Sequence, residues 1–425
     1  LSFMELIMYS LRTIARAMVE PTYLMILICL SIIFYIKNRK ISMLQKLTIG
    51  ESIDSPLELT LSQIVLGIIA GAIGSILISL LGITFESNSG IELLFVISLI
   101  LLFAKPRFVC FAYSGAVLGT ISIIFSLLSG YMDKEPIIKV SILSLMTFVG
   151  ILHIIEGFLV MVDGSRGAVP VFRQDENNIV GGFALKRYWA LPIAVMLMAN
   201  GSAVDGQQII VAAKWWPIIN RSETLALLST AMLVTMPFYG VLGYSSVTFT
   251  KEKKEKALSS GKYILLYGIS VVAVSQLSNI GIIGQIVVLI YVPFAHEFML
   301  KYQRKSEKKN ECLYISDDNG IAILEVAPNS HAFKVGIRRG DKIVAVNGAP
   351  IINEGDIFRA LRDNINGIPI KVRTVAGNIV EYFVQPKNKR LGVLLVPKME
   401  KNDKITNMDK DEFRKILEEL KNKKQ

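Results

Sequence analysis

Histidine and cysteine are both scarce in this chain, with three of each among 425 residues. So few cysteines argue against a disulfide framework, and none of them has the spacing of a metal motif. Walker and dinucleotide-binding glycine loops are absent as well. Charged residues make up only 19% of the sequence and hydrophobic residues 52%, which is too apolar for a soluble chain of this length. The sequence therefore predicts a membrane protein.

The zinc motif H-E-x-x-H is also missing. In that motif two histidines one helical turn apart hold the metal, and the glutamate activates water. His296-Glu297 is followed by Phe-Met-Leu, and no second histidine lies near His153. Asp163-Gly164 and Asp205-Gly206 offer carboxylates, but two histidines without a motif do not make a set of three ligands. We therefore expect no metal, no cofactor and no enzymatic activity.

Two pairs of ionisable residues nevertheless lie in or beside apolar runs. His153 and Glu156 are three residues apart, so they share one helix face, and His296 and Glu297 end the last apolar run. An ionisable residue inside a membrane span is a functional candidate by default. The simpler interpretation is structural: hydrogen bonding within the bundle for the first pair, and solvation at the interface for the second.

Apolar runs alternate with short polar loops between residues 21 and 300. A perpendicular helical span needs about 20 residues, and we expect about eight or nine helices in this region. The runs cover residues 21–36, 61–83, 91–104, 108–129, 137–162, 188–200, 225–249, 263–277 and 280–299. Residues 1–20 mix apolar positions with Arg12 and Arg16, which fits an amphipathic helix at the interface or a short membrane segment.

Lysine and arginine gather in alternate loops, and this bias sets the orientation of the chain. The basic loops are 37–46, 105–107, 163–187 and 250–262, and a further basic stretch at 301–305 follows the last run. The net charge of +11 therefore indicates membrane topology rather than nucleic-acid binding. The bias of lysine and arginine toward alternate loops places the segment after residue 300 in the cytoplasm.

Residues 312–397 differ in character from the apolar region, because small residues and turns recur at fixed offsets. Alternating apolar positions predict a half-buried strand at Ile321, Ile323 and Val326. Gly336 suits a helix C-cap, and Asn347-Gly348 has the chemistry of a tight hairpin turn. The pattern S-x-A, G-I, G-D-x-I and N-G that ends at Gly348 resembles bacterial PDZ domains.

The expected fold is an α-helical polytopic membrane bundle followed by a cytoplasmic α+β PDZ domain and a short helical tail. Residues 301–311 form a basic linker between the two parts. Asn353 can cap a helix that carries Ile357 and Leu361. The charged tail 398–425 has a helical pattern over residues 408–422.

A PDZ domain captures an extended peptide, which pairs with a sheet edge beside a helix. Two turns could supply the backbone donors: Asn319-Gly320-Ile321, which leads to Ile323, and Leu391-Gly392-Val393. The bland interpretation of the second turn is a closing strand with a glycine for close packing. Phe358 and Leu361 lie three apart on the helix, and core packing is the simpler role for both.

Several membrane-region patterns point to a family. They are Glu20-Pro21-Thr22-Tyr23, Tyr35–Lys40, His153–Gly157 and Gly182–Arg187. With the polytopic middle and a single C-terminal PDZ domain, they resemble the MinJ-like topological determinants of cell division in low-GC Gram-positive bacteria. The resemblance implies a non-enzymatic scaffold in the bacterial cell membrane, at septa and poles. The resemblance also implies that the protein is an adaptor between the curvature-sensing coiled coil DivIVA and the division inhibitor MinD.

The residues leave two other classes of protein open. One is an accessory or degenerate relative of a site-2 protease that presents peptides through its PDZ domain. The other is a transporter-like bundle with a regulatory PDZ domain. All three interpretations require membrane lipid and a protein ligand, and none requires nucleic acid.

Overall fold

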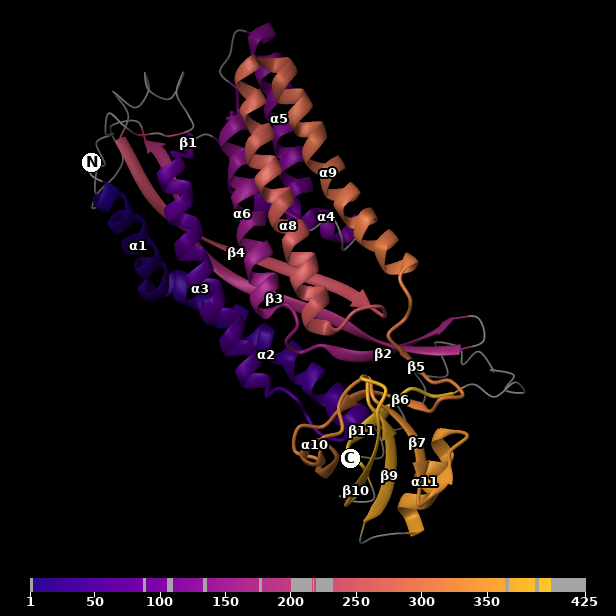
Figure 1. Cartoon of the computed structure of the whole chain (residues 1–425). Coiled ribbons are helices and arrows are strands. Elements are labelled where there is room, and N and C mark those ends of the chain that lie inside the picture. The colour runs from indigo at the N-terminus through magenta and orange to yellow at the C-terminus, as the bar shows by residue number, and fades with distance from the viewer. Residues whose placement is uncertain are drawn as a thin grey trace.

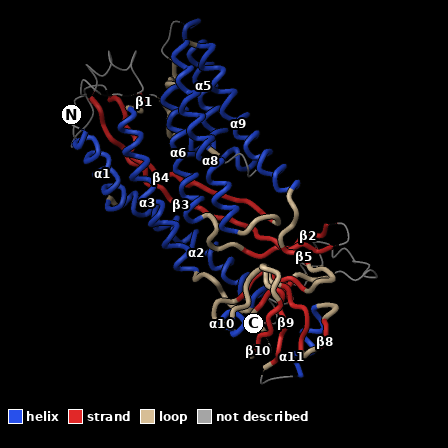
Figure 2. The backbone as a smooth tube through the Cα atoms, viewed as in Figure 1, coloured by secondary structure: helices blue, strands red, loops and turns tan. Residues whose placement is uncertain are grey.

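The structure is a computed structural model, and it describes residues 3–86, 89–104, 110–132, 136–175, 178–199, 216, 218, 232–363, 367–386 and 390–398. The described residues between 3 and 309 form a large body, which carries a smaller C-terminal domain at one end (Figure 1). Helices make up most of the body, and long strands cross it obliquely (Figure 2). The tail helix expected over residues 408–422 lies outside the described residues.

Nine helical segments form the body in the described part of the chain. They are α1 (Phe3–Val19), α2 (Pro21–Ile49), α3 (Pro56–Leu81), α4 (Leu93–Ala104), α5 (Phe111–Met132), α6 (Ile142–Asp163), α8 (Lys253–Ser275), η2 (Gln276–Ile280) and α9 (Ile282–Lys309). Of the described helices, six are long and apolar enough to cross a membrane: α2, α3, α5, α6, α8 continued by η2, and α9. The expected multi-pass membrane character is confirmed.

Local sequence signals set the ends of α3. The Ser55 side chain accepts a hydrogen bond from the Glu58 backbone N–H, and Pro56 occupies the first turn. The helix ends at Gly82, whose φ of 80° lies in the left-handed region that glycine adopts without strain. Such caps satisfy backbone groups that the helix itself leaves unpaired.

Paired glycines bring α6 and α8 into close contact. A Cβ on Gly157 would lie 2.8 Å from the carbonyl oxygen of Gly261, and one on Gly261 would lie 2.6 Å from that of Gly157. Two turns along, Gly150 and Gly268 face each other in the same way, with Cβ-to-oxygen distances of 3.0 and 2.7 Å. Small residues at a helix crossing let the backbones approach, and the resulting van der Waals contacts favour association of membrane helices.

Two of the predicted membrane helices are strands, so that part of the prediction is wrong. The run 188–200 belongs to β3 (Asn178–Ala199), and the run 225–249 contains β4 (Met232–Thr248). The two strands pair antiparallel from Phe183↔Thr248 to Ala199↔Met232. The other edge of β3 pairs with β2 (Val169–Asp175) and, in parallel, with β1 (Thr84–Glu86).

β3 lies between helices, which explains its uninterrupted apolar sequence. Trp189, Leu191 and Ile193 are buried in the core that α6 shares, and Gly67 and Gly71 of α3 face the strand's carbonyl groups. A Cβ at either glycine would clash with the backbone of β3. Strand backbone is tolerated at membrane depth only where protein covers it. A strand buried on both faces has the same continuous apolar pattern as a buried helix.

The C-terminal domain is an antiparallel sheet with two short helices. Its elements are β5 (Tyr314–Ile315), β6 (Ile321–Val326), α10 (His331–Val335), β7 (Lys342–Val346), β8 (Ala349–Pro350), α11 (Glu354–Asp363), β9 (Ile368–Arg373), β10 (Ile379–Val384) and β11 (Val393–Leu395). The strand order is β10-β9-β7-β6-β11. The predicted C-cap at Gly336, with a φ of 109°, and the Asn347-Gly348 turn, with φ values of 52° and 77°, are confirmed.

β6 is buried on both faces, so the prediction of a half-buried strand is wrong. Ile321 and Ile323 pack into the core of the C-terminal domain. Ala322 and Leu324 belong instead to the core of the membrane body. The sheet therefore covers the body with its second face, and the sequence of β6 reflects two cores rather than one.

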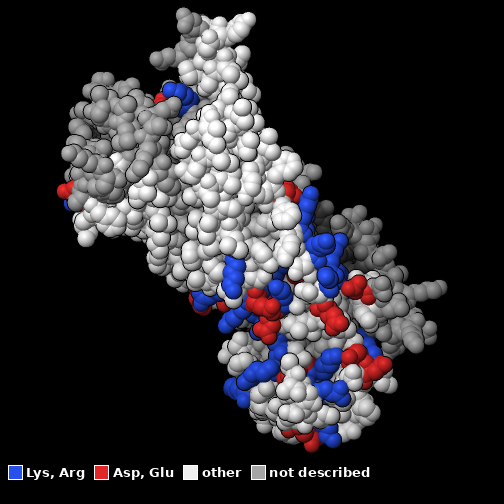
Figure 3. Space-filling view, turned by 45° about the horizontal axis from the view of Figure 1, so that its top comes forward, with Lys and Arg blue, Asp and Glu red and all other residues white. Residues whose placement is uncertain are grey.

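Charged side chains gather at the end of the molecule that carries the C-terminal domain (Figure 3). In that view they cover the domain and the adjoining ends of the body's helices, whereas the flank of the body is almost free of them. Burying charge in hydrocarbon is costly, so the uncharged flank marks the part of the body that lipid surrounds.

Candidate functional site

The outer strand β11 is the candidate site for peptide capture. Within the described sheet it pairs with β6 on one side and with no strand on the other. The Gly392 carbonyl accepts from Ala327 N–H at 2.7 Å, and Val396 N–H donates to the Ala322 carbonyl at 2.8 Å. Because backbone direction alternates along a strand, the N–H and C=O groups of Val393 and Leu395 point toward the open edge.

The two predicted turns occupy different positions in this sheet. Gly320, with a φ of 137°, precedes β6, and a Cβ there would lie 2.5 Å from the Ile343 carbonyl oxygen. β6 has partners on both edges, since β7 pairs at Ile321 and β11 at Ile323. A peptide could not add beside Ile321 and Ile323 without displacing a strand. Asn319 is exposed on the turn, where its N–H donates to Asp317 Oδ1.

The second turn leads directly into the open strand. Gly392, with a φ of 73°, lies between Leu391, which is buried in the domain core, and Val393. The geometry therefore favours Leu391-Gly392-Val393 over the earlier turn as the place where a peptide end would meet backbone donors.

Helix α11 presents a different face from the one predicted. Leu361 is buried together with Ile357, whereas the Phe358 side chain is 61% exposed. The expectation that Phe358 packs into the core is wrong, because the core face of α11 follows the four-residue spacing of Ile357 and Leu361. Asn353 caps the helix as predicted: its Oδ1 accepts from Asp356 N–H, and Asp356 Oδ2 accepts from Asn353 N–H.

The C-terminal end of α2 reaches the same strand. Gly50, which ends α2, lies beside Arg390, three residues before β11, where an added Cβ would be 3.4 Å from the Arg390 guanidinium. A peptide on the β11 edge would therefore meet the basic end of α2, which carries Lys46 in its last turn, as well as the C-terminal domain.

A charged cluster joins the C-terminal domain to the body. Glu325 of β6 accepts a hydrogen bond from Lys253 Nζ of α8 at 2.8 Å and another from Arg339 Nε at 3.1 Å. The Glu325 carboxylate is buried, so both partners are needed to compensate its desolvation. The cluster ties the first residue of a membrane helix to the central sheet of the domain.

Apolar and backbone contacts reinforce this joint. β5 pairs with β3 at Val180↔Ile315 and Gly181↔Tyr314. The buried Tyr314 ring meets Phe183 edge-on at a centroid distance of 5.7 Å, and burial raises the pKa of its hydroxyl. Gly181 leaves room for Val396, whose Cγ2 would be 2.8 Å from an added Cβ. The body and the domain therefore share a continuous core.

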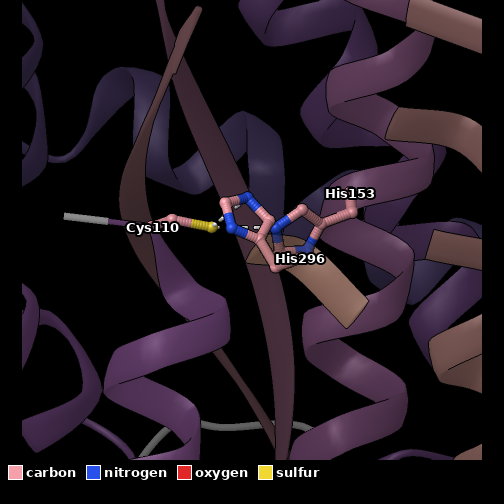
Figure 4. Close-up of side chains that lie close together, drawn as sticks. All are labelled: Cys110, His153 and His296. Atoms are coloured by element: carbon pink, nitrogen blue, oxygen red, sulfur yellow. Dashed lines mark hydrogen bonds between the residues drawn. The ribbon is translucent and has the colours of Figure 1, made fainter. Parts of the chain in front are cut away.

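Two of the intramembrane candidates, His153 and His296, lie beside Cys110, which the sequence analysis did not select. His153 of α6 and His296 of α9 are both buried, and their Nε2 atoms lie 3.0 and 3.6 Å from Cys110 Sγ (Figure 4). Glu156 is half-buried one turn from His153, and Glu297 accepts a hydrogen bond from the Tyr113 hydroxyl. Three potential metal ligands therefore do lie together, and the prediction that the chain offers no such set is wrong.

No sequence signal could have found this cluster. Cys110 lies 43 residues from His153 and 186 residues from His296 along the chain, and only the packing of α5, α6 and α9 brings them together. The carboxylate of Asp163, considered above as a ligand, is engaged elsewhere. Its Oδ2 accepts from the Nε of fully buried Arg187 and from Trp189 Nε1, each at 2.9 Å. Asp205 lies outside the described residues.

Comparison with known proteins finds a domain family and one curated relative. A PDZ domain family model matches residues 323–373. The chain is 21% identical over 253 residues to the cell division topological determinant MinJ of Bacillus subtilis (strain 168), an alignment that covers 59% of this chain and 60% of MinJ. The match thus spans less than two thirds of that relative. No solved structure matches the chain.

Proposed function

We propose that this chain is a non-enzymatic membrane adaptor whose cytoplasmic PDZ domain recruits proteins of cell division. The observation that carries the proposal is the open β11 edge on a domain fixed to a multi-pass membrane body. Addition of a strand to such an edge is a common way for PDZ domains to bind peptide. The alignment with a protein named for determining division topology supports the division context.

The partners and the location follow from the same resemblance. By analogy with the MinJ-like family, the ligands are a DivIVA-like protein and a MinD-like protein, and the chain gathers at septa and poles. The basic ends of α2 and α8 beside the domain support a cytoplasmic location for the β11 edge, because positive charge favours that side of the membrane.

The test compares two substitutions at Val393 in the full-length chain. Val393→Pro removes an N–H that faces the open edge, while the pairing of β11 with β6 can persist, because proline is tolerated where an edge N–H faces solvent. Val393→Ala keeps the N–H and removes more of the side chain than proline does, so it is the control for lost side-chain contacts. We expect the proline variant to insert in the membrane but to lose co-purification of the DivIVA-like and MinD-like proteins and to lose septal localisation.

Two results would count against the proposal. If the proline and alanine variants recruit both proteins equally, the β11 edge is not the recruiting surface. If a fluorescent fusion of the unaltered chain is uniform around dividing cells, the chain has no topological role in division.

A further inference from the structure

Three groups that can ligate a metal meet inside the helical body, away from the PDZ domain. Cys110 precedes α5, His153 lies in the middle of α6, and His296 lies on α9. One ligand atom from each lies within 4.8 Å of the other two. Figure 4 shows the thiol and the two imidazole rings directed at one another from separate elements.

A backbone hydrogen bond at Nδ1 of His153 determines that Nε2 is the nitrogen available as a ligand. Its Nδ1 lies 2.8 Å from the Val149 carbonyl oxygen, and a carbonyl can only accept. Nδ1 therefore carries the proton in the neutral ring, and Nε2 presents a lone pair toward Cys110. Fixing the tautomer through a backbone carbonyl is the usual outer-shell arrangement of a metal-binding histidine.

The same reasoning applies to His296. The Tyr113 hydroxyl donates its single hydrogen to Glu297 Oε1 at 2.7 Å, so its oxygen accepts from His296 Nδ1 at 3.1 Å. His296 Nε2 then also presents a lone pair to the cluster. The chain Glu297–Tyr113–His296 is a carboxylate relay that orients the ring and raises its basicity as a ligand.

Hydrogen bonds among Cys110, His153 and His296 alone cannot pair both Nε2 lone pairs. The Cys110 thiol has one hydrogen, so it can donate to the Nε2 of His153 or of His296 but not to both. One buried nitrogen lone pair would then have no donor among these groups, and buried polar atoms of this kind are rarely left unpaired. A cation held by a thiolate and two imidazoles would engage all three atoms.

The distances fit a tetrahedral ion. Zinc bonds of about 2.3 Å to sulfur and about 2.0–2.1 Å to nitrogen place the two ligand atoms about 3.6 Å apart. The Sγ-to-Nε2 distance is 3.6 Å for His296, which matches this spacing, and a shorter 3.0 Å for His153. Sulfur and imidazole ligands favour zinc over magnesium or calcium, which prefer oxygen.

Aromatic rings close the cluster on a further side. Tyr267 of α8 contacts the rings of His153 and His296 at centroid distances of 4.9 and 5.3 Å. Its own hydroxyl donates to the Val292 carbonyl, so it does not compete for the ligand atoms. The two histidines are thus held on packed helices, and Cys110 directly precedes the first residue of α5.

We propose that Cys110, His153 and His296 bind a zinc ion that ties the start of α5 to α6 and α9. Binding forms a thiolate–zinc bond and releases the thiol proton to solvent. Three protein ligands leave the fourth position of the ion for water or another small ligand. None of the three ligands lies in β11, so the zinc proposal does not depend on the adaptor proposal.

The first test is the metal content of the unaltered chain. The full-length protein is purified in detergent after zinc loading, loosely bound metal is removed by gel filtration, and metals are measured by mass spectrometry. We expect about one zinc per chain, as a single tetrahedral site requires. Absence of stoichiometric metal after loading would overturn the proposal without any variant, and so would a different transition ion that zinc does not displace.

Variants then locate the ion. Cys110→Ser should abolish stoichiometric zinc, whereas Cys29→Ser, at an exposed position on α2, should retain it. Tyr113→Phe keeps all three ligands but removes the acceptor for His296 Nδ1, and should weaken zinc affinity by about 10–100-fold. Cobalt added in place of zinc should give thiolate-to-cobalt absorption in the unaltered chain and not in Cys110→Ser. Equal zinc in the Cys110 and Cys29 variants would overturn the assignment.

Discussion

Lys253, the first residue of α8, donates a hydrogen bond to Glu325 of β6 across 2.8 Å. This pair links a membrane helix to a strand that lies next to the candidate peptide-binding strand. The PDZ domain is therefore part of the folded body rather than a module at the end of a free linker.

Removing Lys253 should loosen the joint. Lys253→Ala leaves Glu325 with Arg339 alone, and we expect a loss of about 1–3 kcal/mol at the interface because a buried charged hydrogen bond is broken. Hydrogen exchange of β5 and β6 would report the change. Lys254→Ala, at an exposed neighbouring position, is the control, and equal protection in the two variants would contradict the assigned role.

The glycine contact between α6 and α8 should not tolerate a methyl group. Gly157→Ala places a Cβ 2.7 Å from Leu265 N and 2.8 Å from Gly261 O, so the helices must separate. We expect a cost of about 1–3 kcal/mol, seen as a lower unfolding temperature in detergent. Gly130→Ala on α5, where nothing lies within 4 Å, should be neutral or stabilising. If both variants melt alike, close packing at Gly157 is unimportant.

The buried ion pair of Asp163 and Arg187 should be sensitive to loss of one partner. Asp163→Ala leaves a fully buried guanidinium without its carboxylate, which typically costs about 3–5 kcal/mol. Arg166→Ala breaks an exposed pair with Glu58 and only a looser 4.0 Å contact with Asp163, so it should cost about 1 kcal/mol. Thermal unfolding of the three proteins would rank them, and a larger effect at Arg166 would refute this ordering.

The α11 cap predicts a pH dependence. Hydrogen bonds from the backbone N–H groups of Ile352 and Asn353 hold the pKa of Asp356 below its ordinary value of 3.8. A depressed folded-state pKa gives stability that is present above the unfolded-state pKa and lost as pH falls through the folded value. Asp356→Asn should therefore lower protection of α11 amides at neutral pH and match the unaltered chain in strong acid. A difference that persists in acid would exclude this cause.

The sequence predicted the PDZ domain well because its signals are local. Gly336 and Asn347-Gly348 require backbone conformations that few other residues adopt, and Asn353 with Asp356 forms a reciprocal cap. Each signal is contained within a few residues, so no knowledge of distant contacts is needed.

The parts that the sequence could not predict depend on distant contacts. β3 and β4 have the hydropathy of membrane helices, and only the cover supplied by α3 and α6 makes strands possible there. The same holds for Cys110, whose partners come from two other helices. The burial of Phe358 was wrongly predicted because three- and four-residue spacings both fit one helix face. The core contains Ile357 and Leu361, which are four residues apart.

On the adaptor proposal, the pairing of β5 with β3 would also determine how a captured partner is presented. Because the Gly181↔Tyr314 pairing joins the domain to the membrane body, the β11 edge would keep a constant height and tilt relative to the bilayer. A partner protein that also binds the membrane could make its membrane contact and its peptide contact with β11 at the same time. Once one contact has formed, the effective concentration for the other is high. Little orientational freedom would remain to be lost on binding, so a weak peptide contact could support lasting residence at the membrane.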